Sequence, residues 1–167
     1  MKFAIRLAAL ASIATFSLTA CGSEPEATET AAPDGVPGVS VENARLILPA
    51  VAGNPAAVYF DLSMDDTGSA TAVRAASVAD AGSAQVHQTM EYGGEMVMNE
   101  AGPEALRPGE TLSFSPGGLH VMAFDLAEGL AVGDTTEVTL TVVGGDKFSF
   151  PAEVRDIASE DAATAAE

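Results

Sequence analysis

Hydrophobic and polar residues alternate along most of the chain between residues 39 and 154. Side chains two apart on a strand point to the same face, so this period predicts strands with one buried face. Clusters of glycine, proline, asparagine and aspartate separate the alternating runs and are expected to form turns. The predicted strands are 39–48, 56–64, 70–78, 84–89, 95–100, 111–115, 119–126, 136–143 and 147–154.

These predicted strands are short and regularly spaced, and no segment has a long helical period. Such a pattern is typical of an all-β fold, so we expect an antiparallel β-sandwich or a small β-barrel. The run "VTLTVVGGDKFSF", residues 138–150, is the clearest hairpin because a glycine pair separates two alternating stretches.

The first 20 residues have the features of a lipoprotein signal peptide. Lys2 and Arg6 make a basic start, and the apolar run over residues 7–18 is shorter than the roughly 20 residues that span a bilayer. The run ends in "LTAC", which resembles a bacterial lipobox. This resemblance implies cleavage before Cys21 and lipidation of that cysteine. It also implies a periplasmic or otherwise extracytoplasmic protein that is anchored by lipid to a bacterial membrane.

Composition divides the rest of the chain into three parts. Residues 21–38 comprise the lipidated cysteine and an acidic segment rich in proline, alanine and threonine, which predicts a flexible linker. Residues 39–155 form the predicted β domain. Residues 156–167 are acidic and poor in large apolar side chains, so we expect a disordered tail there.

Charge and cysteine content argue against several functions. The formal charge of −17 argues against nucleic-acid binding, which needs a basic surface, and favours the attraction of cations or basic protein patches. Cys21 is the only cysteine, so its lipidation leaves the domain without a disulfide, a thiolate nucleophile or a cysteine metal ligand. Because the chain has no Gly-x-Ser-x-Gly elbow or other catalytic spacing, we predict that it is not an enzyme.

Histidine and methionine gather in one part of the chain. Of the 6 methionines and 2 histidines, only Met1 and Met64 lie outside the segment from His87 to Met122. We assign Met64 to the core. His120 and Met122 are two residues apart on one predicted strand and therefore share a face.

Two more methionines and the other histidine can approach His120 and Met122. Met96 and Met98 share a face of another predicted strand, and Gly93 and Gly94 allow the chain to turn back so that His87 approaches Met98. Either one imidazole with three thioethers or two of each can then converge. Thioether sulfur is soft, so either set favours Cu(I) over zinc, calcium or magnesium. A blue-copper electron-transfer site is excluded because it needs a cysteine.

The spacing His87-x10-Met98-x21-His120-x-Met122, together with "VHQTM", "MVM" and "LRPGETLSFSPGGLHVMAFDL", resembles the periplasmic copper chaperones of the PCu(A)C family. The resemblance covers residues 39–154. It implies that these four residues bind Cu(I) in a cupredoxin-like β fold. It further implies that the protein supplies copper for cytochrome c oxidase assembly, with a Sco-type thiol protein or the copper-bearing oxidase subunit as receiver.

Two further methionines and two other functions stay open. Met96 is an auxiliary candidate because it shares the face of Met98. Met90 is three residues after His87, so on a regular strand it points to the opposite face, and it is expected over the site or at the surface.

One alternative function is periplasmic copper buffering for resistance, with the same site. The other is a structural Ig-like lipoprotein whose methionines fill the core. The tail contains neither histidine nor methionine, which argues against a second copper site there.

Overall fold

The computed structural model describes residues 35–158. The predicted signal peptide, Cys21, residues 22–34 of the predicted linker and residues 159–167 of the predicted tail lie outside the described residues. The strands are β1 (Val39–Ile47), β2 (Ala56–Met64), β3 (Thr71–Val78), β4 (Ala81–Tyr92), β5 (Glu95–Glu100), β6 (Glu104–Leu106), β7 (Thr111–Phe114), β8 (Leu119–Leu126), β9 (Thr135–Val142) and β10 (Lys147–Arg155).

The strands confirm the all-β prediction. Each of the nine predicted runs forms a strand. The largest difference in length is in β4, where alternation predicts residues 84–89 and the strand extends three residues further at each end. The pattern does not predict β6, because three residues are too few to show a period. Within residues 35–158 no helix is long and apolar enough to cross a membrane.

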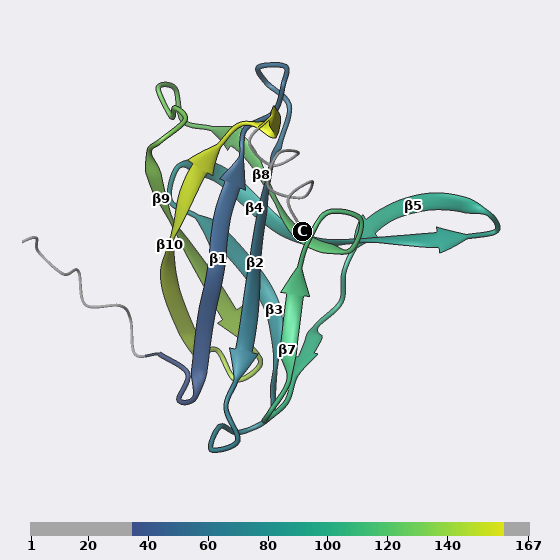
Figure 1. Ribbon diagram of the computed structural model, residues 1–167, viewed down its shortest axis with the longest axis vertical. Coiled ribbons are helices and arrows are strands. Elements are labelled where there is room, and N and C mark those ends of the chain that lie inside the picture. Colours follow the sequence, from purple (N-terminus) through teal and green to yellow (C-terminus); the bar gives the residue numbers. More distant parts are fainter. Residues whose placement is uncertain (1–34, 159–167) are drawn as a thin grey trace, which may run out of the picture. The chain divides into compact units, whose positions relative to one another are not determined.

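All these strands belong to one hydrogen-bonded sheet, in the order β5-β4-β8-β7-β2-β1-β10-β9-β3-β6, and β8 also pairs with β2. Among the described strands the pairings are antiparallel, except those of β1 with β10 and of β7 with β8. The sheet folds over so that β3 contacts β4 and β6 contacts β7. Its two halves therefore face each other as a cupredoxin-like, Ig-like β-sandwich (Figure 1).

The core lies between the two halves and is built from the alternating apolar positions. In β2 every second side chain is buried, from Ala56 to Met64. Met64 is 2% exposed, which confirms its predicted place in the core. The Phe60 ring stacks on that of Phe114 with centroids 4.2 Å apart and lies 5.0 Å from that of Phe150. Full burial of such a side chain contributes about 1.5–3 kcal/mol.

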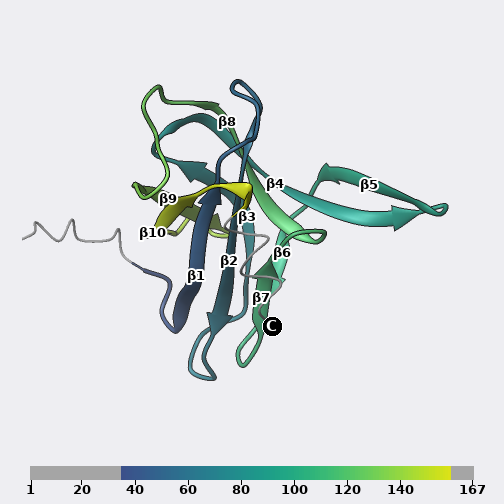
Figure 2. The same ribbon diagram turned by 45° about the horizontal axis from the view of Figure 1, so that its top comes forward.

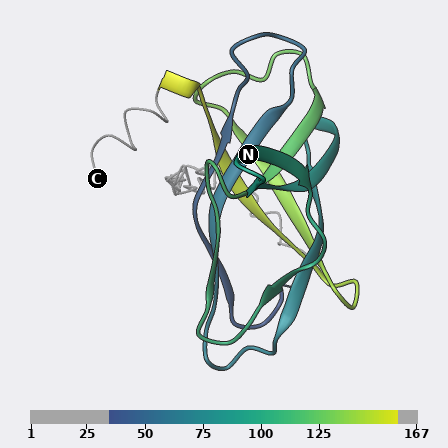
Figure 3. The same cartoon turned by 90° about the vertical axis from the view of Figure 1, so that its right-hand side faces the viewer.

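The β4 strand is longer than its pairing with β8. Residues 81–88 pair with β8, and residues 87–92 pair with β5. The outer part of β4 therefore projects from the side of the sandwich together with β5, as Figure 2 shows, and this hairpin points toward the viewer in Figure 3. Gly93 and Gly94 have φ of 64° and 87° and form the predicted tight turn, because both positions need a positive φ.

Candidate metal centre

The predicted metal-binding residues lie where β4 passes from β8 to β5. His87 on β4 is paired with His120 on β8 and, on its other side, with Glu100 on β5. Residues directly opposite each other in an antiparallel pair point to the same face. The three side chains therefore share one face of the sheet, opposite to that of the core residues Val86 and Val121.

The two imidazole rings are close enough to share one ion. Their centroids are 6.0 Å apart and their planes are inclined by 52°. With metal–nitrogen bonds of about 2 Å, an ion held between two imidazoles leaves the ring centroids up to roughly 6 Å apart. The observed separation lies at this upper limit, so the two rings are within reach of one shared ion.

A backbone carbonyl orients His120. Its Nδ1–H donates to the carbonyl oxygen of Gly118 at 3.0 Å, and because a carbonyl only accepts, Nδ1 carries the ring proton. The same oxygen accepts the backbone N–H of Thr89 at 3.1 Å, which joins the start of β8 to β4. Gly117, with φ of 78°, makes the turn that presents this carbonyl. The Nε2 of His120 is left with its lone pair, an arrangement typical of metal-ligating histidines.

The His87 ring is oriented by a side chain of its own strand. Its Nε2 donates to the Oε1 of Gln85 at 3.2 Å. Its Nδ1 is buried and has no hydrogen-bond partner among the described residues. Burial of the ring, and then its proximity to His120, lowers the pKa of His87 below the usual 6.5, while the charge of Glu100 acts to raise it. The ring therefore stays neutral at ordinary pH and offers a buried lone pair.

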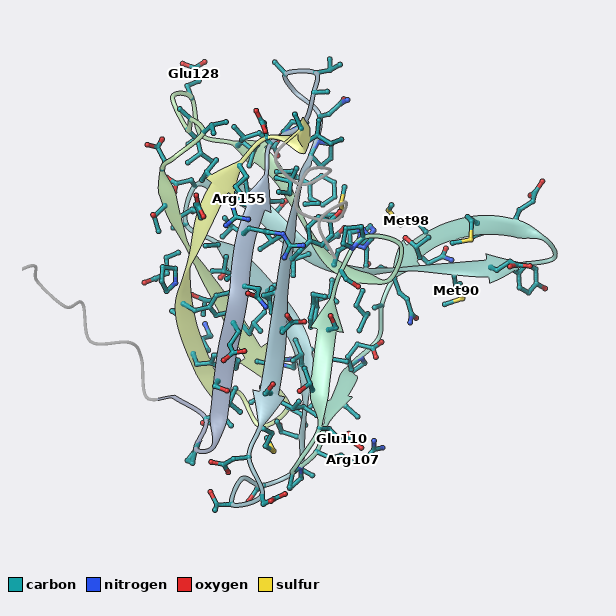
Figure 4. The ribbon with its side chains drawn as sticks, viewed as in Figure 1. Met90, Met98, Arg107, Glu110, Glu128 and Arg155 are labelled. Atoms are coloured by element: carbon teal, nitrogen blue, oxygen red, sulfur yellow. The ribbon has the colours of Figure 1, made fainter. Side chains whose placement is uncertain are left out.

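Met122 and Met98 lie on the same face as the two histidines. Met122 follows His120 by two residues on β8, and Met98 is paired with Thr89, one same-face position beyond His87. Met98 lies near the base of the hairpin in Figure 4. Exposure rises from 4% for His120 to 51% for Met98, and Met122 is intermediate. The structure thus brings the two histidines together and places both methionines on the same face as the rings, one on either side along β4.

Met96 and Met90 lie on opposite faces of the hairpin. Met96 is paired with Glu91 and shares the face of Met98. Met90 is paired with Val97 and therefore belongs to the other face. Figure 4 shows Met90 and Met98 on opposite sides of the hairpin ribbon. Both placements agree with the parity read from the sequence, and both side chains are exposed.

Sequence reasoning missed the aromatic side chains beside the histidines. The Tyr59 ring centroid lies 6.3 Å from that of His120, and the Phe124 ring lies 6.4 Å from that of His87. The guanidinium of Arg45 lies 5.3 Å from the centroid of the Tyr59 ring. Alternation along the strand was the signal that could have indicated Phe124, which is four residues after His120 and so shares its face. Tyr59 comes from another strand, and only the pairing of the strands reveals its place.

The donor set determines the kind of ion that fits. Within residues 35–158 no three His, Cys, Asp or Glu side chains form a group that could hold a metal ion. The candidate site instead has two imidazoles with thioethers on the same face. Neutral nitrogen and sulfur donors suit a soft monovalent cation and bind hard divalent cations weakly.

Comparisons with known proteins identify the family and the fold. The family described as "Putative lipoprotein LpqE-like" matches residues 39–154. No curated protein matches the chain. Three solved structures are similar to this chain: two PCuAC domains and the CuI form of DR1885. The apo PCuAC domain from PmoF1 is 25% identical and has a TM-score of 0.60. The match covers 73% of this chain and 97% of that domain.

The other two structures contain copper according to their descriptions. The copper-bound PCuAC domain from PmoF2 is 21% identical, with a TM-score of 0.58, and covers 73% of this chain and 96% of its own. The CuI form of DR1885 from Deinococcus radiodurans is 24% identical, with a TM-score of 0.57, and covers 73% of this chain and 80% of its own. Both structures share the β fold of this chain.

Proposed function

Because the chain belongs to the LpqE-like family of PCuAC-type proteins, we propose that it binds one Cu(I) ion and hands it on outside the cytoplasm. The proposed ligands are His87, Met98, His120 and Met122. The observation that carries this proposal is the cross-strand pairing of the two histidines, with both methionines on the same face.

The chemistry of the donors supports Cu(I). Thioethers bind Cu(I) well and discriminate against harder cations. The Nδ1 of His87 and the Nε2 of His120 have free lone pairs, because the other nitrogen of each ring donates to an oxygen. The ligands are neutral, and the carboxylate of Glu100 on the same face supplies a nearby negative charge. The copper-bound domain from PmoF2 supports copper, and CuI-DR1885 supports this oxidation state.

The proposed task is to hold the ion and release it, and no catalysis is involved. A thiolate binds Cu(I) more strongly than a thioether does, so an acceptor with cysteine ligands can remove the ion by ligand exchange. We propose a Sco-type thiol protein or the copper-bearing oxidase subunit as that acceptor, in the assembly of cytochrome c oxidase. Lipidation of Cys21 would keep the carrier on its membrane.

A Cu(I) competition titration against a coloured chelator tests the site. We expect the purified protein to take up one equivalent, and His120→Ala and Met122→Ala to lose this uptake while keeping the far-ultraviolet circular dichroism of a folded β protein. Met90→Ala is the matched control, since it removes a thioether from the opposite face of the hairpin, and it should bind like the unaltered protein. Uptake no greater than that of an unstructured peptide would leave only a structural β domain.

Deletion of the gene tests the cellular role. If the protein delivers copper, the deletion strain should lose oxidase activity at low copper and regain it when copper is added. A strain with normal oxidase that is sensitive only to excess copper would instead indicate buffering.

A further inference from the structure

We propose that Met96 is a transfer ligand, which forms with Met98 a second, transient Cu(I) site on the hairpin. The ion would enter and leave the four-residue site through this pair. The inference rests on the proposed function, because it concerns the route of the same ion. Met96 and Met98 are two residues apart on β5, so their side chains point to the same face.

The two sulfurs lie along a path from solvent to the histidines. On the face that contains His87, the β5 residues from the sandwich outward are Glu100, Met98 and Met96. Exposure rises along this path, from 51% for Met98 to 63% for Met96. Strand residues two apart are separated by about 6.6 Å, and unbranched, flexible thioether side chains can close such a gap around one ion.

The charge of the hairpin favours a cation at this position. Residues 87–100 contain Glu91, Glu95 and Glu100, and no lysine or arginine. Glu91 is paired directly opposite Met96, so its carboxylate shares the face of that thioether. Negative charge raises the local concentration of a cation, and the exposed thioether supplies the soft donor. An exposed pair of this kind binds more weakly than the site with two imidazoles, as a transient site requires.

The transfer step is a ligand exchange at copper. The ion keeps its bond to the Sδ of Met98, a bond to the Sδ of Met96 forms, and the bonds to the two histidines and to Met122 break. Copper remains Cu(I), so no electron moves, and both imidazoles remain neutral, so no proton moves. An acceptor thiolate then displaces the two thioethers at the exposed end of the hairpin.

The test compares affinity with the rate of exchange. Met96→Leu keeps an apolar side chain of similar size and removes only the sulfur. We expect its Cu(I) dissociation constant to stay within about twofold of that of the unaltered protein. Transfer of Cu(I) to bicinchoninate, followed by stopped-flow absorbance, should slow by about fivefold or more. Met90→Leu, on the opposite face of the same hairpin, is the matched control and should change neither quantity.

Each other outcome would overturn part of the scheme. An unchanged transfer rate in Met96→Leu would remove Met96 from the path. A loss of affinity as large as that in Met98→Leu would make Met96 a resident ligand, and equal slowing in Met90→Leu would assign the effect to the hairpin's shape; both contradict the transfer role. In all three cases the unaltered protein still binds Cu(I), so the proposed function stands. Failure of the unaltered protein to take up Cu(I) would contradict the proposed function itself.

Discussion

At the scale of single residues, the hydrogen-bond partners of each histidine indicate which ring nitrogen carries the proton. Neutral imidazole has one donor and one acceptor nitrogen, and the tautomer follows from the partner of the donor. The Gly118 carbonyl selects Nδ1–H in His120, and the Gln85 side chain selects Nε2–H in His87. Both rings are thereby prepared to ligate before any ion arrives, which lowers the cost of ordering them on binding.

The pH dependence of Cu(I) binding follows from the pKa of His87. Its folded-state pKa lies below 6.5, so this ring stays neutral down to a lower pH than free imidazole. We expect affinity to weaken as the pH falls below 6.5 and through this lowered pKa, because the proton then competes with the ion. The apo fold should also lose stability over this window, since the unfolded chain binds the proton more readily. Titrations at several pH values check this, and a flat affinity would contradict ligation by histidine.

At the scale of elements, a side chain on β2 joins both neighbouring strands. Asp61 accepts a hydrogen bond from the Nδ2 of Asn43 on β1 at 2.9 Å and one from the Oγ of Ser113 on β7 at 2.7 Å. Asn43 has φ of 56° and lies where the register of β1 shifts against β2. Asp61 therefore holds a bulged strand in register on the face of the sheet that also contains Tyr59.

Removal of this carboxylate should weaken the fold in a pH-dependent way. The hydrogen bonds from Asn43 and then Ser113 lower the pKa of Asp61 below 3.8. Their stabilisation is thus present above pH 3.8 and is lost as the pH falls through the lower, folded-state pKa. We expect Asp61→Ala to reduce the free energy of unfolding by about 1 kcal/mol at neutral pH, since the group is partly exposed. Urea denaturation measures this loss. Glu128→Ala, in an exposed loop, is the control, and an equal loss in both variants would contradict the role given to Asp61.

At the scale of the whole domain, one strand beside the site, β2, packs into the core through its other face. Phe60 on β2 contacts Phe114 on β7 and Phe150 on β10, and so joins three strands of the sheet in one aromatic cluster. Its neighbour Tyr59 points to the opposite face, beside His120. One strand therefore stabilises the fold with one face and lines the candidate metal centre with the other.

Core substitutions should separate stability from copper binding. We expect Phe60→Ala to reduce the free energy of unfolding by about 3–5 kcal/mol, a large part of the roughly 5–15 kcal/mol of a typical domain. Phe60→Leu should lose less and stay folded, with unchanged Cu(I) affinity, because the altered side chain faces away from the site. Val143→Ala, at a position that is 54% exposed, is the stability control for both. Weakened binding in the folded Phe60→Leu protein would contradict the independence of the two faces.

Local pattern was sufficient for much of this structure. The period of two predicted nine of the strands, and the glycine pair predicted the turn between β4 and β5, because alternation and a positive φ are properties of neighbouring residues. The shared face of His120 and Met122, and the opposite faces of His87 and Met90, follow from the same period. The composition of the segment also indicated the soft donor set.

The tertiary structure alone decided how these local pieces meet. The pairing of His87 with His120 depends on the register of β4 against β8, which are far apart in the sequence. A shift of one residue in that register would place the two imidazoles on opposite faces. The Gly118 carbonyl and the Tyr59 ring reach His120 only through the turn before β8 and the proximity of β2. The sequence determined which donors were available, and the long-range packing of the sheet determined which of them stand together, because register is selected by burial of the whole core.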